Sequence, residues 1–155
     1  MARTDRLFYF LFLMIAISPL RSQEGLPAKH SRNQHSEKEA RKVIEAYFPL
    51  FSKRDVKGLL SVINFPHIRV TDSKTVIIPS AEQWTGDPTP LESHWRRSAL
   101  DSLTFVQSDD QKTHALVVFS RYNANDKRYV SYSTLWIVTK LNGHWGIQVR
   151  STFAP

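Results

Sequence analysis

Residues 129–153, YVSYSTLWIVTKLNGHWGIQVRSTF, contain the pattern that decides the fold. Two segments rich in aromatic and β-branched side chains flank Asn142-Gly143, a dipeptide typical of the tight turn between antiparallel strands. The stretch therefore predicts a long β-hairpin, with strands at 129–140 and 144–153.

The first strand of this hairpin is apolar on both faces. Side chains alternate between the two faces of a strand, and here neither set is mainly polar. The two sets are Val130, Tyr132 and Trp136, and Leu135 and Ile137. Burial on both sides gives this pattern, so we expect one face to pack on helices and line a cavity, and the other to meet a partner subunit or another layer. In the last strand, strict alternation places Arg150 on the face opposite Ile147.

The segments before the hairpin predict helices first and strands afterwards. Apolar residues recur every three or four positions after Ser36, a good N-cap, and predict an amphipathic helix that Pro49 kinks or ends. Asp55 can cap a second short helix that reaches Ile63. The other expected elements are strands at 68–71 and 75–78, a helical turn at 80–84, a helix at 90–100, and strands at 103–108 and 114–122.

With this order of elements, the chain resembles the nuclear transport factor 2-like (NTF2-like) superfamily, the α+β cone fold shared with SnoaL-type polyketide cyclases, ketosteroid isomerase and scytalone dehydratase. The resemblance covers about 37–153, and His144–Arg150 is similar to the last strand of many uncharacterised bacterial members. It implies N-terminal helices packed in the concave face of a curved, mostly antiparallel sheet. It also implies a cavity open at one end and homodimers formed through the outer face of the sheet.

The N-terminus has the pattern of a secretory signal peptide. Arg3 and Arg6 precede an apolar run at 7–20, and polar residues follow it. As a helix this run would extend only about 21 Å, short of the roughly 30 Å hydrocarbon core, which disfavours a permanent span. We expect cleavage after Ser22, with Ser18 as the alternative site and an uncleaved anchor as the alternative fate. The mature chain would be secreted or periplasmic, with a flexible lead-in at 23–36 and a folded domain at 37–155.

Composition narrows the classes of partner and cofactor. The 155 residues are 41% hydrophobic, which suits one domain with a core, and the absence of cysteine excludes thiol chemistry and disulfides. Removing residues 1–22 lowers the formal charge from +7 to +5, and the basic residues that remain are scattered, so we expect no nucleic-acid partner. The histidine spacings match no compact ligand motif, so we expect no metal, and no motif predicts a cofactor.

Three arginines on the predicted strands are candidates for binding a ligand. Arg69, Arg121 and Arg150 can present guanidinium groups to a carboxylate or another oxyanion. The alternative for Arg69 and Arg150 is an ion pair with Glu45, Asp55 or Asp101.

Proton transfer and apolar lining have further candidates. His67, at the entrance to a strand, is the candidate acid or base, and Tyr122 is the candidate to stabilise an oxyanion. The alternative for His67 is a hydrogen bond to backbone groups. Trp84 and Trp145 are candidates for the wall of a pocket, with burial in the core as the alternative.

Three functions follow from these candidates. The first is a domain that binds a small apolar or carboxylated ligand in the cone cavity. The second is an isomerase, cyclase or dehydratase in which His67 moves a proton; no base and donor pair stands in a recognisable ketosteroid-isomerase position, so the sequence leaves the question of an enzyme open. The third is a dimeric protein-interaction module.

Overall fold

The computed structural model describes residues 32–72, 74–87 and 91–153. The expected signal peptide at 1–22 and the first part of the expected lead-in, 23–31, lie outside the described residues. The described helices are α1 (Gln34–Ser52), α2 (Val56–Leu60) and the 3₁₀ turn η1 (Ala81–Gln83). The strands are β1 (Ile63–Val70), β2 (Thr75–Ile78), β3 (Trp95–Ser108), β4 (Lys112–Asn123), β5 (Arg128–Leu141) and β6 (His144–Thr152).

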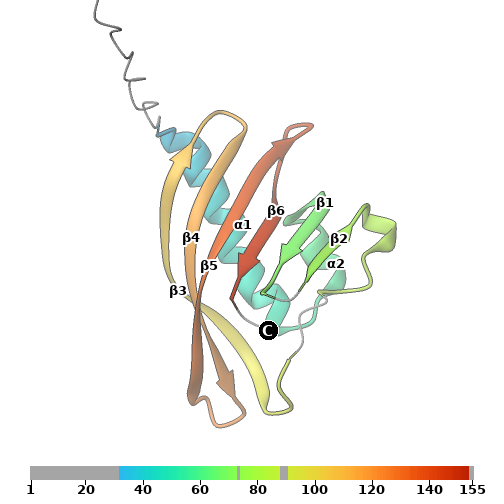
Figure 1. The fold of residues 1–155 in the computed structure, drawn as a ribbon, viewed down its shortest axis with the longest axis vertical. Helices are drawn as coiled ribbons and strands as arrows, with labels where there is room; N and C mark the ends of the chain where they lie inside the picture. The colour runs from blue at the N-terminus through green and yellow to red at the C-terminus, as the bar shows by residue number, and fades with distance from the viewer. Residues whose placement is uncertain (1–31, 73, 88–90, 154–155) are drawn as a thin grey trace, which may run out of the picture.

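The strands form one curved sheet, and α1 crosses one of its faces (Figure 1). The strand order is β2-β1-β6-β5-β4-β3. Neighbouring strands are antiparallel except β1 and β6, which are parallel. This is the α+β architecture that the sequence predicts, with a helix against a mostly antiparallel sheet.

Helix α1 begins earlier than expected and continues past its proline. Asn33 is the N-cap: its side-chain oxygen accepts a hydrogen bond from the backbone N–H of Ser36 at 3.0 Å. Ser36 is therefore a buried residue of the first turn, and the lead-in predicted to extend to residue 36 is wrong at its last three positions. Pro49 lies inside the helix, and its carbonyl still accepts from the N–H of Lys53 at 3.1 Å. A proline this late removes one hydrogen bond without ending the helix.

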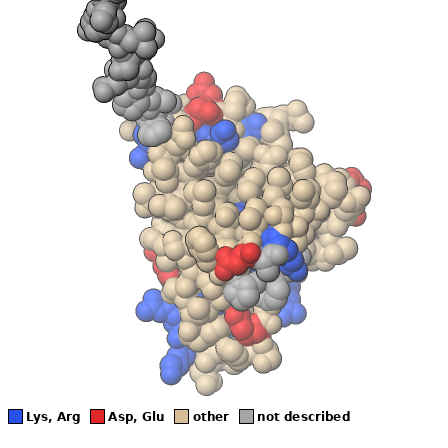
Figure 2. All heavy atoms as spheres, viewed as in Figure 1, with Lys and Arg blue, Asp and Glu red and all other residues tan. Residues whose placement is uncertain are grey.

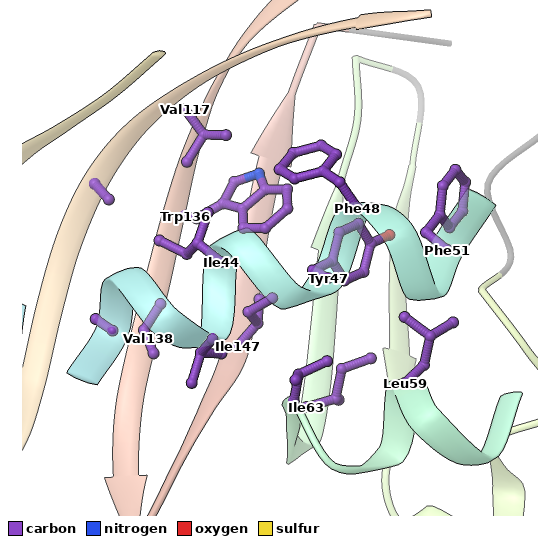
Figure 3. Packing of buried hydrophobic residues seen from close by; sticks show 14 of the residues in the cluster. Ile44, Tyr47, Phe48, Phe51, Leu59, Ile63, Val117, Trp136, Val138 and Ile147 are labelled. Carbon is purple, nitrogen blue, oxygen red and sulfur yellow. The ribbon is translucent and has the colours of Figure 1, made fainter. Parts of the chain in front are cut away.

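The core lies between α1 and the concave face of the sheet (Figure 3). The Trp136 ring on β5 stacks on Phe48 with centroids 5.6 Å apart and meets Tyr47 edge-on at 5.0 Å. Val117 and Ile147, on the neighbouring strands, are fully buried beside them. Burial of aromatic rings this large contributes much of the driving force for folding a small domain.

The helix predicted at 90–100 is wrong, because the described part of this segment enters strand β3 at Trp95. Strand β3 pairs with β4 along its length, but its register shifts at three places, next to Arg97, Ser102 and Gln107. Each irregularity adds a residue to one strand and turns the following side chains to the other face. The apolar residues of β3 therefore do not alternate with a period of two, and their spacing is similar to that of a helix.

The boundary between α2 and β1 also differs from the prediction. Asp55 caps α2 as expected, accepting from the N–H of Gly58 at 2.8 Å, but α2 ends at Leu60 and β1 already begins at Ile63. The prediction placed Ile63 in the helix and began the strand at 68. In the structure Pro66 lies between the register-paired positions of β1, where no ladder hydrogen bond is required of it.

Three hairpin turns join strands β3 to β6 where the sequence predicts breaks. In the last turn Asn142 and Gly143 both have positive φ, 50° and 82°, as the expected two-residue turn requires. Strand β2 and the turn η1 also lie in the segments predicted for them. Among the described residues, no helix is both long and apolar enough to cross a membrane.

Candidate functional site

A β-bulge in β6 turns Arg150 toward the concave face. Val138 on β5 pairs with Ile147, and the next residue, Ile137, pairs with Val149, which leaves Gln148 as an extra residue on β6. Ile147 is consequently buried in the core while Arg150 lines a cavity on the same side of the sheet. The strict alternation expected for the last strand is therefore wrong at this point.

The cavity lies between the C-terminal half of α1 and the sheet, and its volume is about 30 Å³. That volume is enough for about two or three water molecules, far below the roughly 300–1,000 Å³ of pockets for drug-sized ligands. Its walls combine aromatic rings with three arginines. The lining residues are Tyr47, Phe48, Phe51, Arg69, Ser98, Phe119, Arg121, Thr134, Trp136, Arg150 and Thr152.

Arg150 is held by Tyr47 and Asp87. Its guanidinium donates to the Tyr47 hydroxyl at 2.5 Å, and that hydroxyl donates to the Asp87 carboxylate at 2.5 Å. Arg150 Nη2 also lies 2.6 Å from the same Asp87 oxygen. Burial alone would lower the pKa of Arg150, but Asp87 and Tyr47 raise it above its ordinary value. Burial raises the pKa of Tyr47 well above its usual range, so this hydroxyl keeps its proton.

Arg121, which is buried, makes the second ion pair, with the partly exposed Glu92. Its Nη1 donates to both oxygens of Glu92, at 2.7 and 2.8 Å, and the Tyr129 hydroxyl donates to Glu92 at 2.9 Å. Burial opposes the charge of Glu92, but hydrogen bonds from its own backbone and from Tyr129, together with the charge of Arg121, lower its pKa overall. The carboxylate is therefore ionised at neutral pH, and Arg121 is only 2% exposed.

Arg69 adds a third buried cation directly beside Arg150. The two residues are register partners on the parallel strands β1 and β6. Burial lowers the pKa of Arg69, and repulsion from Arg150 lowers it further. Arg121 pairs with Glu92 and Arg150 with Asp87, and the charge of Asp87 also acts on Arg69, raising its pKa against the effects of burial and Arg150.

Apart from Arg150 Nη2, which lies in the ion pair with Asp87, two guanidinium N–H groups of these arginines find no hydrogen-bond acceptor among the described residues. They are the Nε atoms of Arg121 and Arg150, both buried. A buried donor without an acceptor costs about 1–3 kcal/mol, and more when it is charged. An anion placed between the arginines would supply the acceptor that these groups lack. The ion-pair partners of Arg121 and Arg150 are Glu92 and Asp87. The acids that the sequence suggested were Glu45, Asp55 and Asp101, and they do not form these two pairs.

His67 is completely buried on β1 and is not part of the cavity wall. Its Nδ1 lies 3.1 Å from the carbonyl oxygen of Ile147, and its Nε2 has no hydrogen-bond partner in the described part of the chain. Burial, followed by the charge of Arg150, lowers its pKa to about 4, so the ring is neutral at pH 7. The backbone contact agrees with the alternative considered for His67, and its role in proton transfer stays a prediction.

The remaining candidates lie outside the cavity. Tyr122 does not line it; the Arg97 guanidinium lies 3.7 Å from the centre of its ring. Trp84 is buried behind β1, where it meets the His67 ring edge-on at 5.6 Å. Trp145 is only partly buried against the core. The structure therefore brings Arg69, Arg121 and Arg150 together and leaves Tyr122, Trp84 and Trp145 apart from them.

Sequence reasoning missed three residues of this site. Tyr47 is predicted only as part of the apolar face of α1, and Asp87 only as part of the break before Pro88. Glu92 belongs to the segment that was assigned to a helix. A tyrosine on an otherwise apolar helix face was the one available signal, because a buried hydroxyl needs a polar partner. No group of three His, Asp or Glu side chains that could hold a metal gathers within 32–72, 74–87 and 91–153.

Comparison with known proteins identifies relatives by structure only, because no protein-family model and no curated protein matches the sequence. A Nostoc punctiforme protein of unknown function with a cystatin-like fold is similar over 79% of this chain and 93% of its own, at 14% identity and a TM-score of 0.62. An NTF2-like protein of unknown function from Pseudomonas putida is similar over 81% and 90%, at 14% identity and a TM-score of 0.61. A putative calcium/calmodulin-dependent kinase II association domain from Exiguobacterium sibiricum is similar over 79% and 95%, at 7% identity and a TM-score of 0.56.

These likenesses confirm the predicted fold. The chain has the NTF2-like, cystatin-like cone fold, in which α1 fills the concave face of a six-stranded sheet. At such low identity they define the fold and not the activity.

Proposed function

We propose that the cone binds a small carboxylate anion, which Arg69, Arg121 and Arg150 hold against the rings of Tyr47 and Trp136. The observation that carries this proposal is the convergence of three buried guanidinium groups on one cavity. Buried charged groups are stable only when they are paired or hydrogen-bonded, and a ligand carboxylate would supply acceptors to the Nε–H groups of Arg121 and Arg150.

Geometry and size support a carboxylate. The planar guanidinium fork matches a carboxylate, and the free Nε–H groups of Arg121 and Arg150 are available to it. A cavity of about 30 Å³ accommodates a group of a few atoms, such as a carboxylate. It is too small for a whole drug-sized ligand. The aromatic walls exclude water and strengthen the charge interaction.

The test is calorimetric titration with sodium acetate, compared with acetamide as the uncharged analogue and sodium chloride at equal ionic strength. We expect acetate to bind and acetamide not to bind. Arg150→Lys and Arg121→Lys keep the charge but lose the fork, and each should weaken acetate at least tenfold. Arg97→Lys is the matched control, because Arg97 lies outside the cavity. Equal binding of acetate and acetamide, or equal weakening by Arg97→Lys, would refute the proposal.

A second candidate function is self-association through the face of the sheet away from α1. Leu116 on β4 and Leu135 on β5 are register partners, and they are 45% and 38% exposed. Figure 2 shows a broad area without Lys, Arg, Asp or Glu across the upper middle of the molecule, with charged side chains above and below it. Exposed apolar patches with a charged rim are typical of protein interfaces. The Exiguobacterium sibiricum protein described above bears the name of an association domain.

We propose that a second copy of the chain covers this face as a homodimer. Light scattering coupled to size exclusion should give twice the chain mass. Leu135→Lys should dissociate the dimer, while Ile77→Lys, an equally severe change on edge strand β2 with Ile77 59% exposed, should not. A monomeric wild-type protein would contradict this proposal.

Export also stays a proposal. It rests on the apolar run at 7–20 after Arg3 and Arg6. N-terminal sequencing of the protein from its own host tests it: a mature chain beginning at residue 23 supports cleavage after Ser22, and an intact residue 1 contradicts it.

A further inference from the structure

A second, larger pocket lies beside the cavity lined by the three arginines, which we call the chamber. Two residues of this pocket also belong to the wall of the chamber or to its ion pairs. We call this pocket the vestibule; its volume is about 320 Å³, and its walls include Phe51, Val56, Leu59, Leu91, Arg54 and Asp87. Phe51 lines both spaces, and Asp87 is the ion-pair partner of Arg150. In Figure 3, Phe51 at the end of α1 and Leu59 on α2 lie on the side toward which the Tyr47 hydroxyl points.

The two spaces differ in the chemistry that they offer. The chamber is small and cationic, whereas the vestibule offers apolar side chains and a volume within the range of small-molecule sites, roughly 300–1,000 Å³. A ligand whose carboxylate lies among the arginines has no room in the chamber for anything larger. The remainder of such a ligand must leave the chamber through one of its walls.

The wall formed by Asp87 and Phe51 is the one that can open. Asp87 follows η1 in the chain, and its carboxylate contacts the Tyr47 hydroxyl and Arg150 Nη2 at this wall of the chamber. A ligand carboxylate offers Arg150 the same oxygen atoms that Asp87 offers. The ion pair with Asp87 is therefore one that an incoming carboxylate can replace.

A rival exit lies between α1 and β3, where a groove shares Phe48 and Ser98 with the chamber. Two hydrogen bonds close it: the Ser52 hydroxyl donates to the carbonyl of Ser98 at 3.1 Å, and the N–H of Ser98 donates back to the same hydroxyl at 3.0 Å. The Trp95 indole also donates to the Ser98 hydroxyl at 3.1 Å. Opening this side would break all three bonds.

From these contacts we propose that the ligand is a monocarboxylic acid with an apolar tail, whose head displaces Asp87 from Arg150 and whose tail occupies the vestibule. Asp87 is thus a built-in competitor for the head group. This inference rests on the proposed binding of a carboxylate by the arginines and specifies the ligand class and its orientation.

The first test compares hexanoate with acetate in calorimetric titrations of the wild-type protein. Four additional methylene groups buried in the vestibule give an expected gain on the order of 100-fold in affinity. Val56→Trp fills the vestibule and should reduce hexanoate to the affinity of acetate. Leu100→Trp fills the rival groove in the same way and should leave the gain intact.

The second test removes the competitor. Asp87→Asn keeps the size of the side chain and deletes its charge, so both acids should bind at least tenfold more tightly. Because this variant leaves Arg150 without its carboxylate, its stability is followed in parallel, and hexanoate should raise its melting temperature more than that of the wild type.

The outcomes separate the two proposals. If acetate binds through the arginines but hexanoate binds no better, or if Leu100→Trp rather than Val56→Trp removes the gain, the vestibule inference is overturned and the arginine site stands. Unchanged or weaker binding by Asp87→Asn overturns the displacement of Asp87. If neither acid binds to any variant, the proposed function itself fails.

Discussion

Replacing His67 by Gln should remove a large part of the acid sensitivity of the fold. His67 is fully buried, and its pKa falls from 6.5 to about 4, first because of burial and then because of Arg150. Asp87 acts in the opposite direction and Arg69 in the same direction as Arg150. The unfolded chain therefore binds a proton between pH 6.5 and 4 that the folded chain does not bind, and acidification through this window favours unfolding.

The magnitude follows from the shift. A difference of about 2.5 pKa units at about 1.4 kcal/mol each gives a loss of about 3 kcal/mol in the free energy of unfolding by pH 4. Urea unfolding at intervals between pH 7.5 and 4 measures this loss in the free energy of unfolding, both in the wild type and in His67→Gln. Gln has no charge to titrate and can still donate a hydrogen bond to the carbonyl of Ile147. Between pH 7.5 and 4, the free energy of unfolding of the variant should therefore fall by about 3 kcal/mol less than that of the wild type, whatever the stability of the variant at pH 7.5. Parallel curves for the two proteins would refute the account of His67 as a buried neutral ring.

Two further substitutions test the packing and polar contacts around the site. Gly146→Ala should destabilise the fold by about 1–3 kcal/mol, because a Cβ there would lie 2.7 Å from the side chain of Asn64 and 2.8 Å from its backbone nitrogen; urea unfolding measures the loss. Tyr47→Phe removes the hydroxyl between Arg150 and Asp87 and should cost about 2 kcal/mol in thermal unfolding, because two hydrogen bonds to charged groups are lost while the direct ion pair remains.

Each of these substitutions has a matched control. Ser133→Ala is an equally small change at an exposed position of β5 and should change stability by less than about 0.5 kcal/mol. Tyr122→Phe removes a hydroxyl outside the cavity and should be similarly mild. A Tyr47→Phe variant as stable as Tyr122→Phe would contradict the role assigned to the hydroxyl.

The hairpin at the end of the chain was predictable because local signals and burial agree there. Asn142-Gly143 takes the positive φ angles that its composition favours, and Trp136 and Val138 face the core as their alternation requires. Strand β3 was not predictable in the same way, because its three register irregularities destroy the period of two. The start of β1 was not predictable either, because ladder pairing, which the sequence does not show, decides whether Pro66 is tolerated within a strand.

The arginines of the site could be predicted as polar residues on strands, whereas their partners could not. Arg69 and Arg150 become neighbours through the parallel pairing of β1 with β6, a contact between segments 81 residues apart in sequence. Asp87 reaches Arg150 from an irregular segment, where no periodic pattern indicates the direction of a side chain. The bulge at Gln148 decides that Arg150 faces inward, and nothing in the local composition indicates it.

The most direct test of the carboxylate site is to observe the arginine Nε–H groups by NMR while acetate is added. The Nε–H groups of Arg121 and Arg150 are buried and find no acceptor within 32–72, 74–87 and 91–153, so a carboxylate bound between them should move both resonances strongly downfield and slow their exchange with water. Arg97, outside the cavity and over the ring of Tyr122, should change little. Resonances of Arg121 and Arg150 that stay fixed while acetate is raised to saturating levels would contradict the proposed site.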